Sequence, residues 1–134
     1  MTSETVRFDF PARLDRAIDV RFEAERLAER MGFPVEDTEM IGTSAWEATL
    51  NAVMHGSPKG DEQRVQAEIR AEGDELTMTV SSENPDFELP ETDPALTPVT
   101  RRGRGLMIIR AFMDEVRLAH NGKSTLVMVK RLRS

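Results

Sequence analysis

The segment Glu47-Ala-Thr-Leu-Asn51-Ala-Val-Met-His55-Gly56 carries three polar side chains at intervals of four residues. Residues four apart on an α-helix are offset by about 40° around its axis. Glu47, Asn51 and His55 would therefore line one slanted stripe, each one turn from the next. Trp46 can face the protein interior on the same helix. The segment thus predicts a helix with an apolar face and a separate polar stripe.

Two interpretations of this polar stripe remain open. It can be an ordinary solvated face, with His55 favourably placed at the negative C-terminal end of the helix. It can also be a site for a metal ion and a phosphate, because the carbonyl oxygen of asparagine is a hard ligand suited to Mg²⁺. A carboxylate one turn away can act as general base toward a hydroxyl or water. The second interpretation makes Asn51 the metal ligand and Glu47 the catalytic base.

The hydrophobic pattern on either side of this segment predicts three helices and five strands. The expected helices span 12–31, 35–55 and 106–113, and the expected strands span 6–10, 65–70, 76–80, 115–118 and 126–130. Gly32 is the expected C-terminal cap of the first helix. We expect the helices to pack on one face of a mostly antiparallel mixed sheet, as a two-layer α+β sandwich.

Aromatic residues and turn residues add detail to this fold. Four aromatic residues are expected in the core, namely Phe8, Phe10, Phe22 and Trp46. The segment 72–75 is expected to turn one hairpin, and Asn121-Gly122 the last one. His120, close to that last turn, is expected at the surface.

The segment Arg101-Arg-Gly103-Arg-Gly105 is expected to lead into the third helix. Glycines let backbone N–H groups approach phosphates closely, and a helix N-terminus favours anions. The three arginines of this segment, Arg101, Arg102 and Arg104, would add positive charge where phosphates arrive. The alternative is an ordinary turn between loop and helix with a solubilising basic run.

Two further segments carry weaker signals. Residues 81–103 contain four prolines and are expected to be irregular, and a loop longer than about 15 residues in a compact domain is usually functional or mobile. Thr125 enters the last strand from a tight turn. It can belong to a plain hairpin, or it can direct its hydroxyl into a nearby pocket.

Composition limits the class of protein. The chain of 134 residues is the size of one domain, and its net charge of −6 argues against a surface that binds duplex nucleic acid. It has no cysteine, so disulfides and thiolate metal sites are excluded. The first residues do not resemble a signal peptide, and no window approaches the roughly 18 apolar residues of a membrane helix. We therefore expect a cytoplasmic protein.

Taken together, these motifs resemble the anti-sigma-factor serine kinases, small single-domain members of the gyrase and histidine-kinase ATPase superfamily. The segment Glu47–Gly56 reproduces the Glu-Ala-x-x-Asn-Ala-x-x-His-Gly pattern of the family's N box. Gly103–Ile109 resembles its glycine box, and Gly122–Lys130 resembles its closing strand. The resemblance covers nearly the whole chain and implies the histidine-kinase-type ATPase fold over residues 1–134.

The resemblance implies an ATP-dependent protein-serine kinase. Mg²⁺ would be held by Asn51, Glu47 would activate the attacking hydroxyl, and residues 83–105 would form a nucleotide lid. The phosphate acceptor would be a serine on a STAS-type anti-anti-sigma partner, a sigma factor would be sequestered, and the protein would be a homodimer. The residues implied in nucleotide binding are Asn51, His55, Ser82, Asn84, Arg101, Gly103, Arg104, Gly105, Leu106 and Thr125.

The chain departs from the family pattern at the end of the strand before the lid. The family has Asp-x-Gly-x-x-Phe there, and its Asp accepts a hydrogen bond from the adenine amino group. Here Ser82 replaces the Asp and Asn84 replaces the Gly, aligned on Phe87. A serine hydroxyl can still accept one hydrogen bond but lacks the charge that strengthens it. The loss is about 1.5–3 kcal/mol, which leaves open a second interpretation, a nucleotide-weak or inactive partner-binding module of the same fold.

Overall fold

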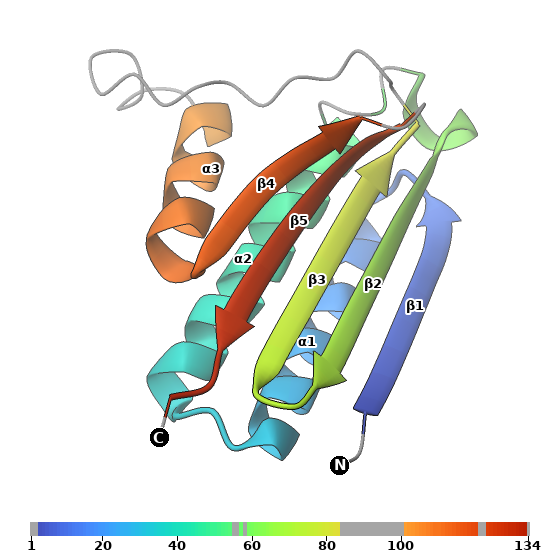
Figure 1. Ribbon diagram of the computed structural model, residues 1–134. Helices are drawn as coiled ribbons and strands as arrows, with labels where there is room; N and C mark the ends of the chain where they lie inside the picture. Colours follow the sequence, from blue (N-terminus) through green and yellow to red (C-terminus); the bar gives the residue numbers. More distant parts are fainter. Residues whose placement is uncertain (1–2, 55–56, 58, 84–100, 121–122, 134) are drawn as a thin grey trace.

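The computed structural model describes residues 3–54, 57, 59–83, 101–120 and 123–133 (Figure 1). The helices are α1 (Ala17–Met31), α2 (Val35–Met54) and α3 (Arg101–Phe112), and short 3₁₀ turns cover Leu14–Arg16 and Gly60–Glu62. The strands are β1 (Ser3–Pro11), β2 (Arg64–Glu72), β3 (Glu75–Ser82), β4 (Glu115–His120) and β5 (Ser124–Arg131). Most of the expected lid, residues 83–105, lies outside the described residues.

The five strands form one sheet in the order β1-β2-β3-β5-β4, and each pair of neighbours is antiparallel. All three helices cover the same face of the sheet (Figure 1). The predicted two-layer α+β sandwich is therefore confirmed, with antiparallel pairing throughout the described strands.

Local sequence explains the breaks between these elements. Gly32 ends α1 with φ of 97°, and its N–H is directed at the last carbonyls of the helix. Gly73 turns the chain between β2 and β3 with φ of 62°. Both values lie in the left-handed region, which glycine enters without the steric cost that a Cβ brings. The predicted cap and the first predicted hairpin are thus both present.

The core lies between the helices and the sheet. Its largest side chains with less than 2% exposure include Phe10, Leu27, Ile41, Ile69, Leu76, Met78, Leu106, Ile109 and Met128. Phe8 and Trp46 are half-buried. Burial of these apolar side chains from all three helices and four strands is the main stabilising contribution to the fold.

The expectation that Phe22 belongs to the core is wrong, because its side chain is 61% exposed. The buried face of α1 is made of Ala17, Val20, Ala24, Leu27 and Ala28. Phe22 lies about 140° around the helix from Ala17, nearly opposite that face. Ile18, one turn before Phe22, is also exposed, at 37%, and so is Leu14 in the preceding 3₁₀ turn, at 49%. Helix α1 therefore has two apolar faces, of which the sheet covers one.

The start of the third helix also differs from the expectation. Helix α3 begins at Arg101, so Gly103 and Gly105 lie inside it and not in the segment that leads to it. Glycine in a helix interior costs roughly 1 kcal/mol relative to alanine. A close contact made by Gly105, described below, is the compensating feature.

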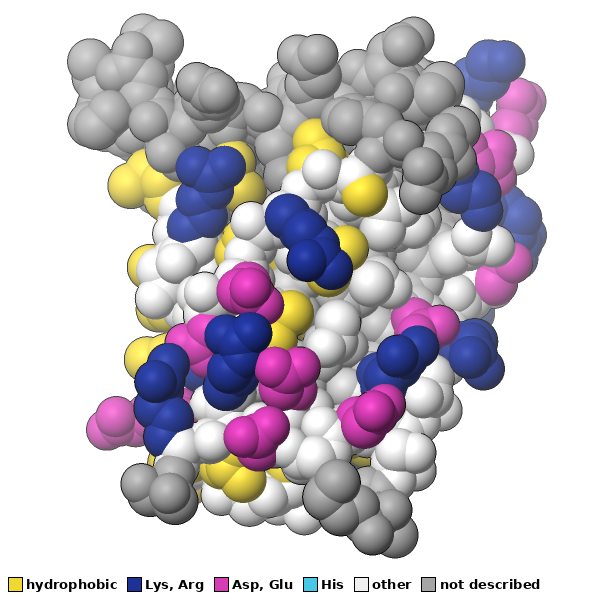
Figure 2. All heavy atoms as spheres, in the orientation of Figure 1, with side chains coloured by type: hydrophobic (Ala, Val, Ile, Leu, Met, Phe, Trp, Pro, Cys, Tyr) yellow, Lys and Arg dark blue, Asp and Glu magenta, His cyan; other side chains and the backbone are white. Residues whose placement is uncertain are grey.

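The open face of the sheet is polar, and the two signs of charge are interspersed on it (Figure 2). Arg131 bridges Glu75 and Glu115 at 2.8 Å each, across β3, β5 and β4. Arg64 pairs with Asp9 across β2 and β1 at 2.6 Å. Such exposed pairs contribute little to stability but keep a solvated face free of large apolar patches. Among the described residues, no helix combines the length and apolar character needed to cross a membrane.

Candidate functional site

Glu47 and Asn51 lie one turn apart on α2, and both are buried, with 7% and 6% exposure. An ordinary solvated face is thereby excluded for these two members of the polar stripe. His55 and Gly56, at the end of the same motif, fall outside the described residues. Burial of a polar group without a hydrogen-bond partner costs free energy, and Nδ2 of Asn51 has no partner among the described residues.

Helix α3 lies directly against the polar stripe at Gly105. A Cβ placed on Gly105 would be 3.2 Å from Oε2 of Glu47 and 3.5 Å from Nδ2 of Asn51. The first distance is tighter than ordinary van der Waals contact, so only glycine lets α3 approach α2 this closely without a shift. The structure therefore brings together two motifs that are more than 50 positions apart in the sequence.

The N-terminal end of α3 is consequently near Glu47 and Asn51. Arg101, Gly103 and Arg104 belong to its first turn, and the first N–H groups of a helix have no carbonyl partner within the helix. Together with the helix dipole, these groups favour an anion at this end. Leu106, also predicted to contact a nucleotide, has a fully buried side chain and contributes to the core.

A small cavity adjoins Asn51 on the side of the sheet. Its volume is about 10 Å³, and it is lined by Ala48, Asn51, Ala52, Val80, Ser82, Leu118, Ser124 and Leu126. Ser82 and Ser124 are register partners in β3 and β5, and each is 2% exposed. Most of the cavity wall is thus apolar, and its polar side-chain atoms come from one asparagine and two serines.

Two polar atoms that line this cavity lack a hydrogen-bond partner among the described residues, Nδ2 of Asn51 and Oγ of Ser82. Unsatisfied buried polar atoms are uncommon in folded proteins and often mark a functional site. Glu83, which follows Ser82, is exposed and accepts a hydrogen bond from the Arg64 backbone N–H at 2.8 Å. Strand alternation thus turns Glu83 away from Ser82, as the sequence indicates.

The structure does not bring Thr125 to the cavity. Its Oγ1 lies 2.8 Å from Oγ of Ser81, on the open face of the sheet, where both residues alternate away from the helices. The neighbouring Ser124 lines the cavity instead, and it is not among the predicted site residues. The period of two could have identified it, because Ser124 shares the inward face with Leu126 and Met128.

These features agree with comparisons to known proteins. Residues 10–130 match the family described as histidine kinase-like ATPase domain. The chain belongs to this family.

Several relatives of this ATPase domain are named serine-protein kinase RsbW. The protein from Bacillus velezensis is 26% identical over 136 residues, which cover 95% of this chain and 85% of the relative. The protein from Bacillus subtilis is 25% identical and covers 97% and 87% of the two chains.

A solved structure of the RsbU and RsbW domains of a Mycobacterium tuberculosis protein has the same fold. Its TM-score is 0.69 at 19% identity, and the match covers 96% of this chain but only 32% of that longer chain. At this identity the likeness establishes the fold alone, in agreement with the two-layer arrangement described above.

The ATPase domain offers few ligands for a metal ion. No group of three or more His, Cys, Asp or Glu residues that could hold one occurs among the described residues. Mg²⁺ commonly takes only one or two protein ligands and completes its shell with phosphate oxygens and water. The amide oxygen Oδ1 of Asn51, beside the carboxylate of Glu47 at Gly105, fits that mode of binding.

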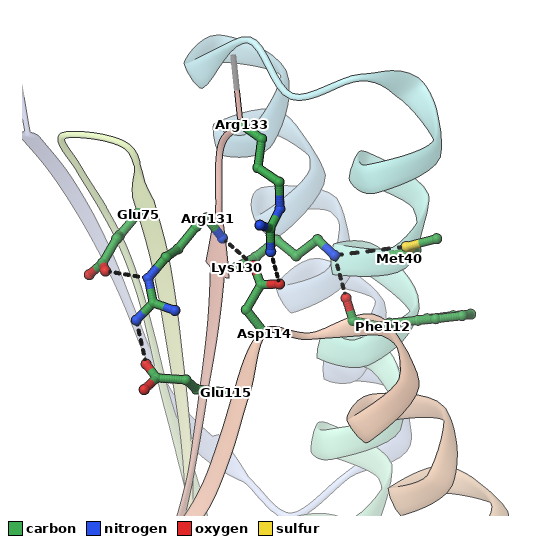
Figure 3. Close-up of polar contacts among 8 residues, drawn as sticks. All are labelled: Met40, Glu75, Phe112, Asp114, Glu115, Lys130, Arg131 and Arg133. Atoms are coloured by element: carbon green, nitrogen blue, oxygen red, sulfur yellow. Dashed lines mark hydrogen bonds and ion pairs between the residues drawn. The ribbon is translucent and has the colours of Figure 1, made fainter.

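The opposite end of α3 is held by β5 (Figure 3). Nζ of Lys130 donates to the carbonyl oxygen of Phe112 at 2.6 Å, and it lies 3.9 Å from Sδ of Met40 in α2. A cation that binds the last carbonyls of a helix also complements the negative end of its dipole. Lys130 therefore links α3 to both the sheet and α2.

Asp114 completes this attachment just beyond α3. Its carboxylate accepts hydrogen bonds from the Arg131 backbone N–H and from Nη2 of Arg133, both at 2.7 Å. Burial raises the pKa of Asp114, but these two hydrogen bonds and the positive charges of Lys130 and Arg133 together hold the pKa below its usual value. The C-terminal end of α3 is thus fixed by charged groups, and its N-terminal end by the contact of Gly105.

Proposed function

We propose that this chain is an ATP- and Mg²⁺-dependent protein-serine kinase whose substrate is a serine of a STAS-type anti-anti-sigma protein. We further propose that it binds a sigma factor in alternation with that partner, as a cytoplasmic homodimer. The observation that carries the proposal is the contact of Gly105 with Glu47 and Asn51, because it joins a helix N-terminus to a buried base and a metal ligand. The RsbW name of the relatives supports the class of activity.

Each residue of this phosphate end, defined as Glu47, Asn51 and Gly105, has a distinct part. Bound Mg²⁺ would neutralise charge on the phosphates, and Oδ1 of Asn51 would hold it. The N–H groups at the start of α3 would bind phosphate oxygens. Glu47 would take the proton from the attacking serine hydroxyl as the bond from oxygen to the γ-phosphorus forms and the bond to ADP breaks.

Phosphate transfer from radiolabelled ATP to a cognate STAS domain tests this assignment. We expect label on the STAS serine with the wild-type chain and none above background with Asn51→Ala. Replacement of the acceptor serine by alanine is the control, because it removes the acceptor and leaves the kinase intact. Full transfer by Asn51→Ala would show that Asn51 does not hold the metal ion.

Ser82 motivates a second candidate, a partner-binding module that turns over little or no nucleotide. A neutral hydroxyl forms a weaker hydrogen bond to a base amino group than a carboxylate does. Calorimetric titration with ATP and Mg²⁺ separates the two candidates. Binding that is lost in Asn51→Ala favours the kinase, whereas no heat at high micromolar nucleotide favours the module.

A further inference from the structure

The cavity beside Asn51 contains a buried hydroxyl that the phosphate end does not use. Ser82 is 2% exposed, and its Oγ has no hydrogen-bond partner among the described residues. Ser124 lies opposite it in the register of β3 and β5. We define these two serines as the base end. The inference below rests on the proposed nucleotide binding and asks which base this end accepts.

The position of the cavity suits the base of a nucleotide whose phosphates lie at α3. Asn51 belongs to both places, since it contacts Gly105 and also lines the cavity. Apart from Asn51 and the two serines, the cavity walls are apolar side chains of α2, β3, β4 and β5. The volume of about 10 Å³ is room for one polar group, such as the substituent at position 6 of a purine, and not for a whole ring.

The hydrogen-bonding capacity of Ser82 determines which substituent is accepted. Adenine presents an amino donor at position 6, whereas guanine presents a carbonyl acceptor there. An ionised carboxylate can only accept, so it pairs with the amino group and repels the carbonyl. A serine hydroxyl carries one donor and two acceptor lone pairs, and it rotates to suit its partner. Neither substituent leaves Ser82 with an unmet hydrogen bond.

The walls of the cavity add little selectivity between the two bases. Strong rejection of an analogue requires a buried polar group that the analogue leaves unpaired. Most of the lining has no polar side-chain atom that an analogue could leave unpaired. These apolar residues are Ala48, Ala52, Val80, Leu118 and Leu126. Of the polar lining residues, Asn51 is assigned above to the metal ion and Ser124 already has an interaction partner, so the choice between the two purines rests on Ser82 at this end.

We propose that Ser82 makes the nucleotide site tolerant of both purines, so that this domain binds GTP about as well as ATP. The specificity is thus for a purine nucleoside triphosphate and not for adenine.

Calorimetric titrations of the full chain with ATP and with GTP, each with Mg²⁺, test the proposal. We expect the two Kd values of the wild type to agree within about tenfold. Ser82→Ala removes a hydrogen bond from either base, so both affinities should fall together, by up to about tenfold. Ser81→Ala is the matched control, because Ser81 precedes Ser82 on β3 but faces the open side of the sheet, and it should change neither affinity.

Ser82→Asp is the most discriminating variant, because its carboxylate should strengthen ATP binding and weaken GTP binding. The ratio of the Kd for GTP to the Kd for ATP should rise by at least about tenfold relative to the wild type. Wild-type binding of ATP with GTP more than about tenfold weaker would overturn the purine proposal and leave the kinase proposal standing. Ser82→Ala with unchanged affinity for both nucleotides would also overturn it. No binding of either nucleotide would refute the proposed nucleotide function itself, and the purine proposal with it.

Discussion

The phosphate end and the base end of the candidate site differ in how closely their residues constrain a ligand. At the phosphate end, Gly105 of α3 lies against Glu47 and Asn51, and a single added methyl group would come within 3.2 Å of the carboxylate. At the base end, the hydroxyl of Ser82 has no hydrogen-bond partner among the described residues and can rotate in a cavity lined mostly by apolar side chains. On the proposed assignment, close packing fixes the groups at the phosphate end, whereas one rotatable hydroxyl, that of Ser82, sets which base is accepted.

The largest expected effect comes from removing the proposed proton acceptor, Glu47, at the phosphate end. Glu47→Gln removes the proton acceptor and preserves the size of the side chain, so we expect phosphate transfer to fall by about 10²–10⁴-fold. ATP affinity should change much less, since the amide still fills the same space. Initial rates of transfer to the STAS domain, with calorimetry for affinity, measure both quantities.

Glu36→Gln is the matched control, because Glu36 lies in the first turn of the same helix and is exposed. Its transfer rate should equal that of the wild type. A Glu47→Gln protein that retains the wild-type rate would remove the general base from the proposed mechanism. The phosphate end would then tolerate a change of side chain as readily as the base end does.

The next effect concerns the close contact itself. Gly105→Ala places a Cβ 3.2 Å from Oε2 of Glu47, which forces the carboxylate to move by a few tenths of an ångström. We expect about tenfold slower transfer, since misplaced catalytic groups lose rate steeply. Stability should hold or rise, because alanine is favoured over glycine in a helix by about 1 kcal/mol.

Transfer rates and urea denaturation of the Gly105→Ala protein distinguish these outcomes. A slower enzyme that is at least as stable as the wild type supports a geometric constraint at the phosphate end. A variant that unfolds more easily while its remaining folded fraction transfers normally would assign Gly105 to packing alone.

A smaller effect is expected from the charged attachment at the other end of α3. Asp114→Asn weakens the hydrogen bonds from the Arg131 backbone and Arg133, so the free energy of unfolding should fall by about 1.5 kcal/mol at pH 7. A lowered pKa stabilises the fold above the ordinary carboxyl value of 3.8 and ceases to do so as pH falls through the folded pKa. The difference between wild type and variant should therefore shrink below pH 4.

Urea denaturation of both proteins at pH 7, 5 and 3 measures this difference. A gap that stays constant with pH would mean that the ionised form of Asp114 contributes nothing, and that only its shape matters. The ratio of the Kd values for GTP and ATP should be the same in the wild type and Asp114→Asn, because Asp114 lies far from Ser82 along the strands.

The smallest effect is expected at Lys130. Lys130→Met keeps the aliphatic stem and removes the donor to Phe112, which should lower the free energy of unfolding by about 1 kcal/mol. Lys59→Met is the control, since Lys59 is exposed and its side chain makes no described hydrogen bond. Equal unfolding free energies for Lys130→Met and the wild type would show that α3 is held by Gly105 and Asp114 without this cap.

Much of this architecture could be predicted because local signals and the packing agree. All eight predicted elements are present, and Ser82 faces inward as strand alternation indicates. The same alternation identifies Ser124, but the threonine beside it resembled the family motif more closely. Where a period of two and a motif disagree, the pleat of the strand determines which side chain reaches the cavity.

The errors have a common physical cause, which is contact between elements. Phe22 is apolar and fits helical spacing, but small residues on the other face of α1 pack closely enough to form the core without it. The start of α3 lies before its glycines because the approach to α2 requires Gly105 inside the helix. His55 and Asn84 lie outside the described residues, so their predicted roles stay predictions.

The half-buried Trp46 gives this domain an optical reporter. It is the only tryptophan in the sequence, and it precedes Glu47 on α2. Its ultraviolet emission therefore arises from a single location, one residue from the proposed base. A change in emission wavelength on addition of a nucleotide would report rearrangement at that location, without a dye or an added label.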